Sequence, residues 1–265
     1  MRVSIIGLGA VGSAALTVLQ NYHSVVGYDI DGRGNWEDVI NSEIAIVCVS
    51  TDAAGDGRLD MGNIHSVSER LAQDEYGGVM IVKSTLQPGT MDLIAENHPL
   101  LNISYMPEFL RERDAVDWFA NPDRIVYSAD GESEQMTLDC FSWVPSEIPR
   151  IRMSNLEAEF GKLAHNAFIA TKVTFTCEIE RIAKSRGIDA NAVMEVVWSD
   201  RRVNNPAHLT PGLGGYSGKC VPKDTAALAF EDPDPGSIFH ILDNRGGDEA
   251  VQSRSGTITI NNDLQ

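Results

Sequence analysis

Positive charge is scarce in this chain. Its 265 residues include 21 lysines and arginines against 38 aspartates and glutamates, which gives a formal net charge of −17. This balance argues against nucleic acid or an anionic membrane as a partner, because both attract basic surfaces. Only six of the basic residues are lysines. An acidic, lysine-poor surface resembles that of proteins from salt-loving organisms, where salt screens the repulsion between carboxylates; an ordinary acidic protein is the alternative.

Long apolar runs and clustered cysteines are also missing from this sequence. No apolar run approaches the length needed to cross a bilayer, and the N-terminus passes directly into a strand-like segment. We therefore expect neither a membrane span nor a signal peptide. The four cysteines (Cys48, Cys140, Cys177 and Cys220) are far apart, without a CxxC pair or metal-ligand spacing. They predict free thiols in a reducing cytoplasm and no metal site.

A glycine-rich turn separates a predicted strand, residues 2–6, from a predicted helix, residues 13–20. Its sequence, Gly7-Leu8-Gly9-Ala10-Val11-Gly12, is the G-x-G-x-x-G pattern of dinucleotide-binding proteins. A second predicted strand, residues 24–28, ends at Asp29, at the spacing typical of a ribose-binding carboxylate. This combination predicts a dinucleotide site.

Each part of this site has its own role. Gly7 makes the tight turn, Gly9 lets the backbone approach the pyrophosphate, and Gly12 lets the helix pack on the strand. Asp29 binds the ribose 2′-hydroxyl and repels a 2′-phosphate, so we expect NAD and not NADP. The cofactor-binding residues expected from this pattern are Gly7, Gly9, Ala10, Val11, Gly12 and Asp29.

Further predicted strands at 44–49, 79–83, 103–105 and 125–127 alternate with helical segments. This alternation predicts an α/β fold, a Rossmann-type doubly wound parallel sheet, over residues 1–153. Ligands of such sheets lie beyond the carboxyl ends of the strands. The segments expected near the nicotinamide are Ser50-Thr51, Lys83-Ser84-Thr85 and Met106-Pro107-Glu108.

A long helix is predicted over residues 155–186. Ser154 and Glu157 form a capping-box pattern at its start, and Gly187 marks its end. We expect this helix to be the spine of a smaller all-α domain, residues 154–230, and of a homodimer. Residues 231–265 are polar and rich in turn formers, and we expect a mobile tail.

Two polar residues of this helix, Lys162 and Asn166, are four apart and therefore share one face. Facing a cleft, they are suited to hold a substrate hydroxyl and to stabilise the alkoxide formed as hydride leaves. The alternative is a solvated lysine paired with Glu159.

The stretch Pro211–Asp224 combines small residues with a cysteine. Glycines lead into Cys220, and Lys219 and Lys223 flank it. Glycine permits close approach of the backbone to a ligand, and neighbouring ammonium groups favour the nucleophilic thiolate. A buried, inert cysteine behind a glycine-rich turn is the alternative.

Together these motifs resemble the nucleotide-sugar dehydrogenase family of UDP-glucose and GDP-mannose dehydrogenases. The motifs that carry the resemblance are Gly7–Gly12, Lys83-Ser84-Thr85, Pro107-Glu108-Phe109-Leu110-Arg111-Glu112, Lys162 with Asn166, Asp200 with Arg202, and Cys220-Val221-Pro222-Lys223-Asp224. The match covers roughly residues 1–228. Family members carry a further C-terminal nucleotide-binding domain, and we expect this chain to be a shortened form without it.

The resemblance implies an NAD-dependent oxidation of a sugar-nucleotide primary alcohol to the carboxylate. Cys220 would trap the aldehyde as a thiohemiacetal, and the resulting thioester would be hydrolysed. Lys162 would stabilise oxyanions and Asn166 would orient the substrate. Asp224 and Thr85 would position water or transfer protons, and Glu108 would act as the base in hydrolysis.

The same resemblance implies further contacts. Additional cofactor-binding residues would be Thr51, Thr85 and Glu112. Substrate-binding residues would be Glu108, Lys162, Asn166, Arg202, Tyr216, Gly218 and Lys223.

Two other functions fit the sequence. One is a one-step dehydrogenase similar to the 3-hydroxyacid and 6-phosphogluconate enzymes, which use a Lys and an Asn four residues apart and need no cysteine. The other is a catalytically silent, NAD-binding oligomer. Replacing Cys220 by serine separates the two enzymes, because only the two-step oxidation needs the thiol.

Overall fold

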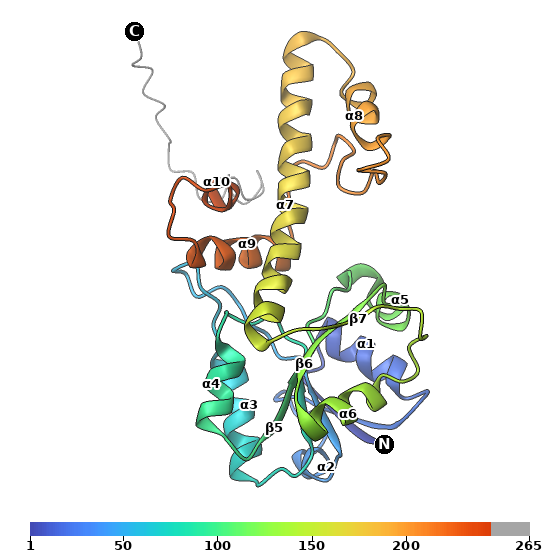
Figure 1. Ribbon diagram of the computed structural model, residues 1–265, viewed down its shortest axis with the longest axis vertical. Helices are drawn as coiled ribbons and strands as arrows, with labels where there is room; N and C mark the ends of the chain where they lie inside the picture. Colours follow the sequence, from blue (N-terminus) through green and yellow to red (C-terminus); the bar gives the residue numbers. More distant parts are fainter. Residues whose placement is uncertain (245–265) are drawn as a thin grey trace. The chain divides into compact units, whose positions relative to one another are not determined.

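The computed structural model describes residues 1–244 and divides the chain into two compact units (Figure 1). The first unit is Met1–Lys162, and the second begins at Leu163. The division falls inside one helix, α7 (Asn155–Arg186). The domain boundary expected at 153/154 lies just before this helix.

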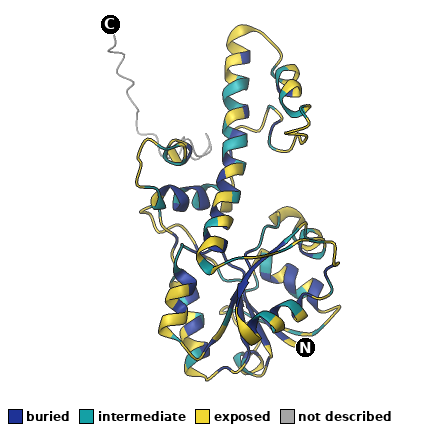
Figure 2. Cartoon of the chain, viewed as in Figure 1, coloured by how far each residue is buried: buried dark blue, intermediate teal, exposed yellow. Residues whose placement is uncertain are grey.

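The first unit is built on a seven-stranded sheet of order β2-β1-β3-β4-β5-β6-β7. Neighbouring strands are parallel, except that β6 runs antiparallel to β5. The strands are β1 (Arg2–Ile6), β2 (Ser24–Tyr28), β3 (Ile44–Val47), β4 (Val79–Val82), β5 (Asn102–Tyr105), β6 (Ile125–Ala129) and β7 (Arg150–Arg152). The central strands β3 and β4 are buried along their whole length (Figure 2), as expected when helices cover both faces.

Two hydrophobic clusters fill the space on either side of this sheet. One joins Val3 and Ile5 to apolar residues of α1 (Ala10–Leu19), α5 (Ala115–Ala120) and α6 (Gly131–Cys140). The other joins Ile6 and Val47 to residues of α2 (Trp36–Ile40), α3 (Gly62–Gln73) and α4 (Thr90–Asn97). Alternate residues of β1 thus supply both cores, which fixes its register in the sheet.

The strand order reverses between β1 and β3. The chain passes from β1 to β2 at the sheet edge and then returns across β1 to β3. At such a switch point the connections leave in opposite directions and open a crevice beyond the carboxyl ends of the strands. The glycine-rich turn follows β1 there, and Ser50-Thr51 follows β3.

The second unit is helical. It contains α7 from Leu163 onward, α8 (Ala190–Trp198), α9 (Cys220–Glu231) and α10 (Ile238–Asn244). Buried residues with helical spacing, Leu163, Ala167, Ala170 and Val173, form the inner face of α7. They are mostly small, so neighbouring backbones can approach this helix closely.

The local signals on α7 are confirmed. The Glu157 side chain accepts a hydrogen bond from the Ser154 backbone amide at 2.9 Å, and the Glu157 amide donates to the Ser154 hydroxyl at 3.3 Å. Gly187 has φ +64°, the left-handed conformation that ends helices. The predicted fold class, a Rossmann-type sheet followed by helices, is therefore confirmed.

Some predicted details were wrong. The sheet is not fully parallel, and β7 and α5 were not predicted, since Arg-Ile-Arg lacks an apolar strand pattern. Within the segment expected to be a mobile tail, Ile238–Asn244 form α10, whereas residues 245–265 lie outside the described part of the chain. No helix among the described residues is long and apolar enough to cross a bilayer.

Candidate active site

The glycine-rich turn has the geometry of a dinucleotide cradle. Gly7 has φ +90°, and a Cβ there would lie 2.8 Å from the Cys48 carbonyl oxygen. A Cβ on Gly12 would lie 1.8 Å from the Gly7 carbonyl oxygen, so only glycine lets α1 begin this close to the turn. Gly9 is different, because a Cβ there would meet no atom within 4 Å. The space at Gly9 is open for a ligand.

The start of α1 fits a pyrophosphate. Gly9 is its N-cap, and no side chain caps the helix. The N–H groups of the first turn, which includes Ala10 and Val11, therefore remain available as donors at the positive end of the helix dipole. These residues fit the diphosphate of NAD. When bound, NAD would serve as the hydride acceptor.

Asp29 ties the end of β2 to this turn. Its Oδ2 accepts a hydrogen bond from the Leu8 amide at 2.7 Å and from the Arg33 guanidinium at 3.2 Å. Arg33 also pairs with Asp31 at 2.8 Å. An arginine beside the ribose carboxylate is the residue that NADP-binding sites use for the 2′-phosphate. Here the Asp29 and Asp31 carboxylates both pair with Arg33, which favours NAD over NADP.

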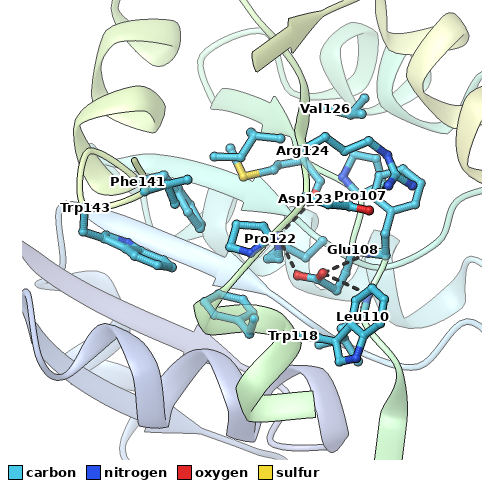
Figure 3. Close-up of a pocket in the computed structure, with 16 residues that line it drawn as sticks. Pro107, Glu108, Leu110, Trp118, Pro122, Asp123, Arg124, Val126, Phe141 and Trp143 are labelled. Carbon is cyan, nitrogen blue, oxygen red and sulfur yellow. Dashed lines mark hydrogen bonds and ion pairs between the residues drawn. The ribbon is translucent and has the colours of Figure 1, made fainter. Parts of the chain in front are cut away.

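A lysine and a glutamate meet at the carboxyl ends of β4 and β5. Lys83 follows β4, and its Nζ lies 3.1 Å from Glu108 Oε2. The Lys83 side chain is 4% exposed and that of Glu108 is 16% exposed. Both line a cavity of about 30 Å³ together with Phe109, Trp118 and Arg124 among others (Figure 3). Glu108 was predicted from the sequence as a site residue, and Lys83 was not.

The other predicted residues of the first unit differ in exposure. Thr51 is buried and Thr85 is half-buried, both just beyond strand ends, as expected. Glu112 begins a short 3-10 helix, Glu112–Asp114, and is exposed. Thr51 and Thr85 thus border the sheet edge, whereas Glu112 lies on the surface.

Lys162, the last residue of the first unit, is not solvated. It is 7% exposed, and its Nζ lies 5.1 Å from the centre of the Phe109 ring. Glu159 is fully buried, and its carboxylate accepts hydrogen bonds from the Gly89 and Met91 amides at 2.6 and 2.8 Å. The alternative of an exposed Lys162 is therefore wrong. Glu159 caps the N-terminus of α4, which fixes the first turns of α7 against the sheet domain.

In the second unit, Asn166 and Asp224 are joined directly. Asn166 Nδ2 donates to Asp224 Oδ2 at 2.6 Å, and Lys223 Nζ contacts the other carboxylate oxygen at 2.7 Å. Asp224 is completely buried. Helix α9 begins at Cys220, so the thiol lies one turn before Asp224 on the same face. Pro222 fits the first turn, where its missing N–H would have no partner.

Among the four free thiols, only Cys220 is exposed. It is the first residue of α9. Cys140 is its opposite: it is fully buried, and burial raises its pKa to about 12. A thiol with that pKa stays protonated at neutral pH and is a poor nucleophile. Cys220 is therefore the most accessible of the four thiols.

The glycine-rich run before Cys220 adopts left-handed conformations. Gly212, Gly214, Gly215 and Gly218 all have positive φ, which predicts strain for any other residue there. Tyr216 is 4% exposed, packs against Ala170 and Val173, and donates its hydroxyl proton to the Leu242 carbonyl. Tyr216 thus anchors this loop in the core, and its contact with the substrate stays a prediction.

Arg202 and Gly218 remain at the surface. The Arg202 guanidinium is exposed and pairs with Asp200 at 2.6 Å. Gly218 is exposed with φ +86°. Both stay predicted substrate contacts. Among residues 1–244, no group of three or more metal-ligating side chains occurs.

The sequence did not predict the contacts of three residues that the structure brings into these sites. They are Arg33, Lys83 and Glu159, and each one holds a predicted residue or element in place. The scarcity of lysine was a usable signal for Lys83. Nothing in the sequence pairs Glu159 with the start of α4, because about 70 residues separate the partners.

Comparison with known proteins assigns both units. The model of the UDP-glucose/GDP-mannose dehydrogenase family, NAD binding domain, matches residues 35–142, and that of the central domain matches residues 156–244. The chain belongs to this family. The resemblance predicted from the sequence is confirmed, and NAD is the cofactor of its first unit.

Individual relatives agree. UDP-glucose 6-dehydrogenase AglM of Haloferax volcanii is 30% identical over 279 residues, covering 86% of this chain and 64% of that protein. UDP-glucose 6-dehydrogenase of Pseudomonas aeruginosa is 32% identical over 232 residues, covering 83% and 49%. The UDP-glucose dehydrogenase structure from Pyrobaculum islandicum superimposes with a TM-score of 0.78 at 29% identity, covering 91% and 66%. The chain spans about half to two thirds of the length of these curated relatives.

Proposed function

We propose that this protein oxidises the primary alcohol of a sugar nucleotide, such as a UDP-hexose, to the carboxylate with NAD. The observation that carries the proposal is the Asn166–Asp224 hydrogen bond with the exposed Cys220 one helical turn away. It supports a thiol nucleophile next to polar groups that can orient a substrate. The dehydrogenases of the family to which the chain belongs support the same chemistry.

In the first oxidation, the substrate hydroxyl loses its proton and its carbon loses hydride, which gives an aldehyde. We assign the buried Lys162 ammonium to the stabilisation of the developing oxyanion. Asn166, fixed by Asp224, orients the substrate oxygen. We assign Thr85 and Asp224 to water positioning and proton transfer.

In the second oxidation, the Cys220 thiolate adds to the aldehyde carbon and forms a thiohemiacetal. Loss of the hydroxyl proton and of a second hydride gives a thioester. Glu108 takes a proton from water, the water oxygen attacks the thioester carbon, and the C–S bond breaks to return the Cys220 thiolate. One alcohol and one water thus become one carboxylate, two hydrides and three protons. The thiol retains the aldehyde between the two hydride transfers.

We also propose a homodimer through α7. Phe168, Phe175 and Ile182 are spaced by seven residues and are 63%, 46% and 46% exposed. Seven-residue apolar spacing is the pattern of a helix that packs on another helix. Arg202 would contact the substrate at this interface. A reducing cytoplasm suits the free thiol that the reaction needs.

The test is a screen for NADH production against UDP- and GDP-sugars in high and low salt, with the Cys220→Ala variant as control. We expect one sugar nucleotide to yield NADH with the wild type and no carboxylate with the variant. NAD binding without turnover of any sugar nucleotide would contradict the proposal and favour the silent oligomer.

A further inference from the structure

The buried ion pair between Lys83 and Glu108 joins the proposed base to a lysine that has no role in the steps given so far. Its two residues follow neighbouring parallel strands, because Val82 of β4 is in register with Tyr105 of β5. The Nζ–Oε2 distance is 3.1 Å. The pair thus lies at the sheet edge where ligands of this fold bind.

The surroundings of the ammonium group hold it in one place. Lys83 Nζ donates to the Met106 carbonyl at 3.3 Å. It also lies 5.4 Å from the centre of the Phe119 ring and 5.3 Å from that of Phe141, within cation–π range. A carboxylate, a carbonyl and two ring faces therefore surround a side chain that is 4% exposed.

Stability alone gives little reason for such a pair. Desolvating two charges offsets most of their attraction, and apolar side chains of similar volume often stabilise a protein equally well. The flanking Phe119 and Phe141 show that this part of the core accommodates apolar groups. A lysine here is better explained by what it does to Glu108.

The contacts of Glu108 leave one acceptor position open. Its Oε1 accepts hydrogen bonds from the Phe109 amide at 2.8 Å and the Leu110 amide at 3.1 Å. Its Oε2 receives Lys83. A carboxylate has about four lone-pair positions, so these three contacts leave one, on Oε2. The dashed lines in Figure 3 show the Glu108 carboxylate held from more than one side.

The adjoining cavity has room for water. Its volume of about 30 Å³ exceeds the roughly 10–15 Å³ that one water molecule needs. Lys83 and Glu108 both line it. A charged donor and a charged acceptor in one small cavity suit an ordered water.

We propose that Lys83 is a positioning residue for hydrolysis, which holds Glu108 so that the remaining position on Oε2 receives the proton of the attacking water. This inference rests on the proposed function, in which Glu108 is the base. It predicts that loss of Lys83 slows thioester hydrolysis and leaves both hydride transfers intact.

The experiment compares Lys83→Met, Glu108→Gln and the double variant, with Lys184→Met as the matched control at an exposed lysine of α7. Rapid mixing with NAD and the sugar nucleotide identified in the screen follows NADH, and intact-protein mass spectrometry follows the acyl adduct on Cys220. We expect a burst of two NADH per site, accumulation of the adduct, and a turnover about 10- to 100-fold lower in Lys83→Met, within the range of general-base effects.

Two further readouts separate positioning from general damage. Hydroxylamine, a stronger nucleophile than water, should release the adduct and restore turnover in Lys83→Met and in Glu108→Gln. The double variant should be no slower than Glu108→Gln, because Lys83 acts through Glu108. The inference would be overturned if Lys83→Met did not accumulate the adduct. It would also be overturned if the fold-loss of turnover in the double variant were the product of the losses in the two single variants.

Crystal structures of the wild type, Lys83→Met and Lys184→Met supply a test that needs no turnover. We expect Glu108 to leave its single position only in Lys83→Met. An unmoved Glu108 carboxylate in that variant would refute the positioning role even if no substrate is found, whereas the absence of turnover in the wild type would refute only the proposed function. If Lys83→Met does not fold, Lys83→Gln replaces it, with the same outcomes expected.

Discussion

Within residues 1–244, each unit has a lysine–carboxylate ion pair that is partly or fully buried, and the two pairs differ in which partner is the less exposed. In the first unit Lys83 is 4% exposed and Glu108 is 16% exposed. In the second, Asp224 is 0% exposed and Lys223 is 15% exposed. In each pair, the less exposed side chain is held by its surroundings, and the more exposed side chain can reach a ligand. We infer that the less exposed residue of each pair, Lys83 or Asp224, fixes the position of the more exposed one, Glu108 or Lys223.

The largest effect is expected at Cys220, one turn from the second pair. Replacing Cys220 by serine removes the thiolate but keeps the side-chain size, so carboxylate formation should fall by about 10³-fold or more. The measurement is carboxylate produced per enzyme per minute. Full activity of the variant would favour the one-step dehydrogenase, which needs no thiol.

Removing the shallow partner of the first pair should destabilise the protein most. Glu108→Ala leaves the Lys83 ammonium buried without its carboxylate, which costs about 3 kcal/mol or more. Lys83→Met leaves Glu108 with two backbone donors, and we expect about 1 kcal/mol. Urea unfolding of both variants gives the comparison. Equal losses would show that the two partners are equally solvated.

Substitutions of two turn glycines in the first unit should have different effects, one on stability and the other on cofactor binding. Gly12→Ala places a methyl group 1.8 Å from the Gly7 carbonyl, so we expect a loss of about 2–3 kcal/mol. Gly9→Ala meets no atom within 4 Å and should fold normally, yet bind NAD about tenfold or more weaker because its methyl group enters the cradle. Calorimetry with NAD and thermal melts measure both. Unchanged NAD affinity in Gly9→Ala would contradict the cradle.

The smallest difference in stability between two variants is expected at the Lys223–Asp224 pair. Lys223→Met leaves the buried Asp224 with the Asn166 amide, so about 1–2 kcal/mol of stability should be lost. Asp224→Asn keeps the shape and leaves Lys223 able to reach solvent, so we expect a smaller loss. Unfolding in urea again gives the comparison. A larger loss for Asp224→Asn would reverse our assignment of the holding partner.

The sequence was sufficient where the signals are local. The capping box at Ser154, the stop at Gly187 and the turn of Gly7 depend on neighbouring residues, and all three occur in the structure. Long-range pairings were not predictable. Lys83 meets Glu108 across two strands, and Glu159 reaches the start of α4.

Tyr216 shows the same limit. The sequence did not predict that its ring lies in the core with its hydroxyl on the Leu242 carbonyl. An aromatic ring in a loop can become buried where a neighbouring helix has small residues, here Ala170 on α7. Loop sequence alone does not show what lies beneath the loop.

We propose that Cys220 retains the aldehyde between the two hydride transfers. The most direct measurement counts NADH formed per sugar nucleotide consumed, with product identified by mass spectrometry. We predict two NADH and one carboxylate for each substrate molecule. One NADH with a released aldehyde or ketone would contradict the account.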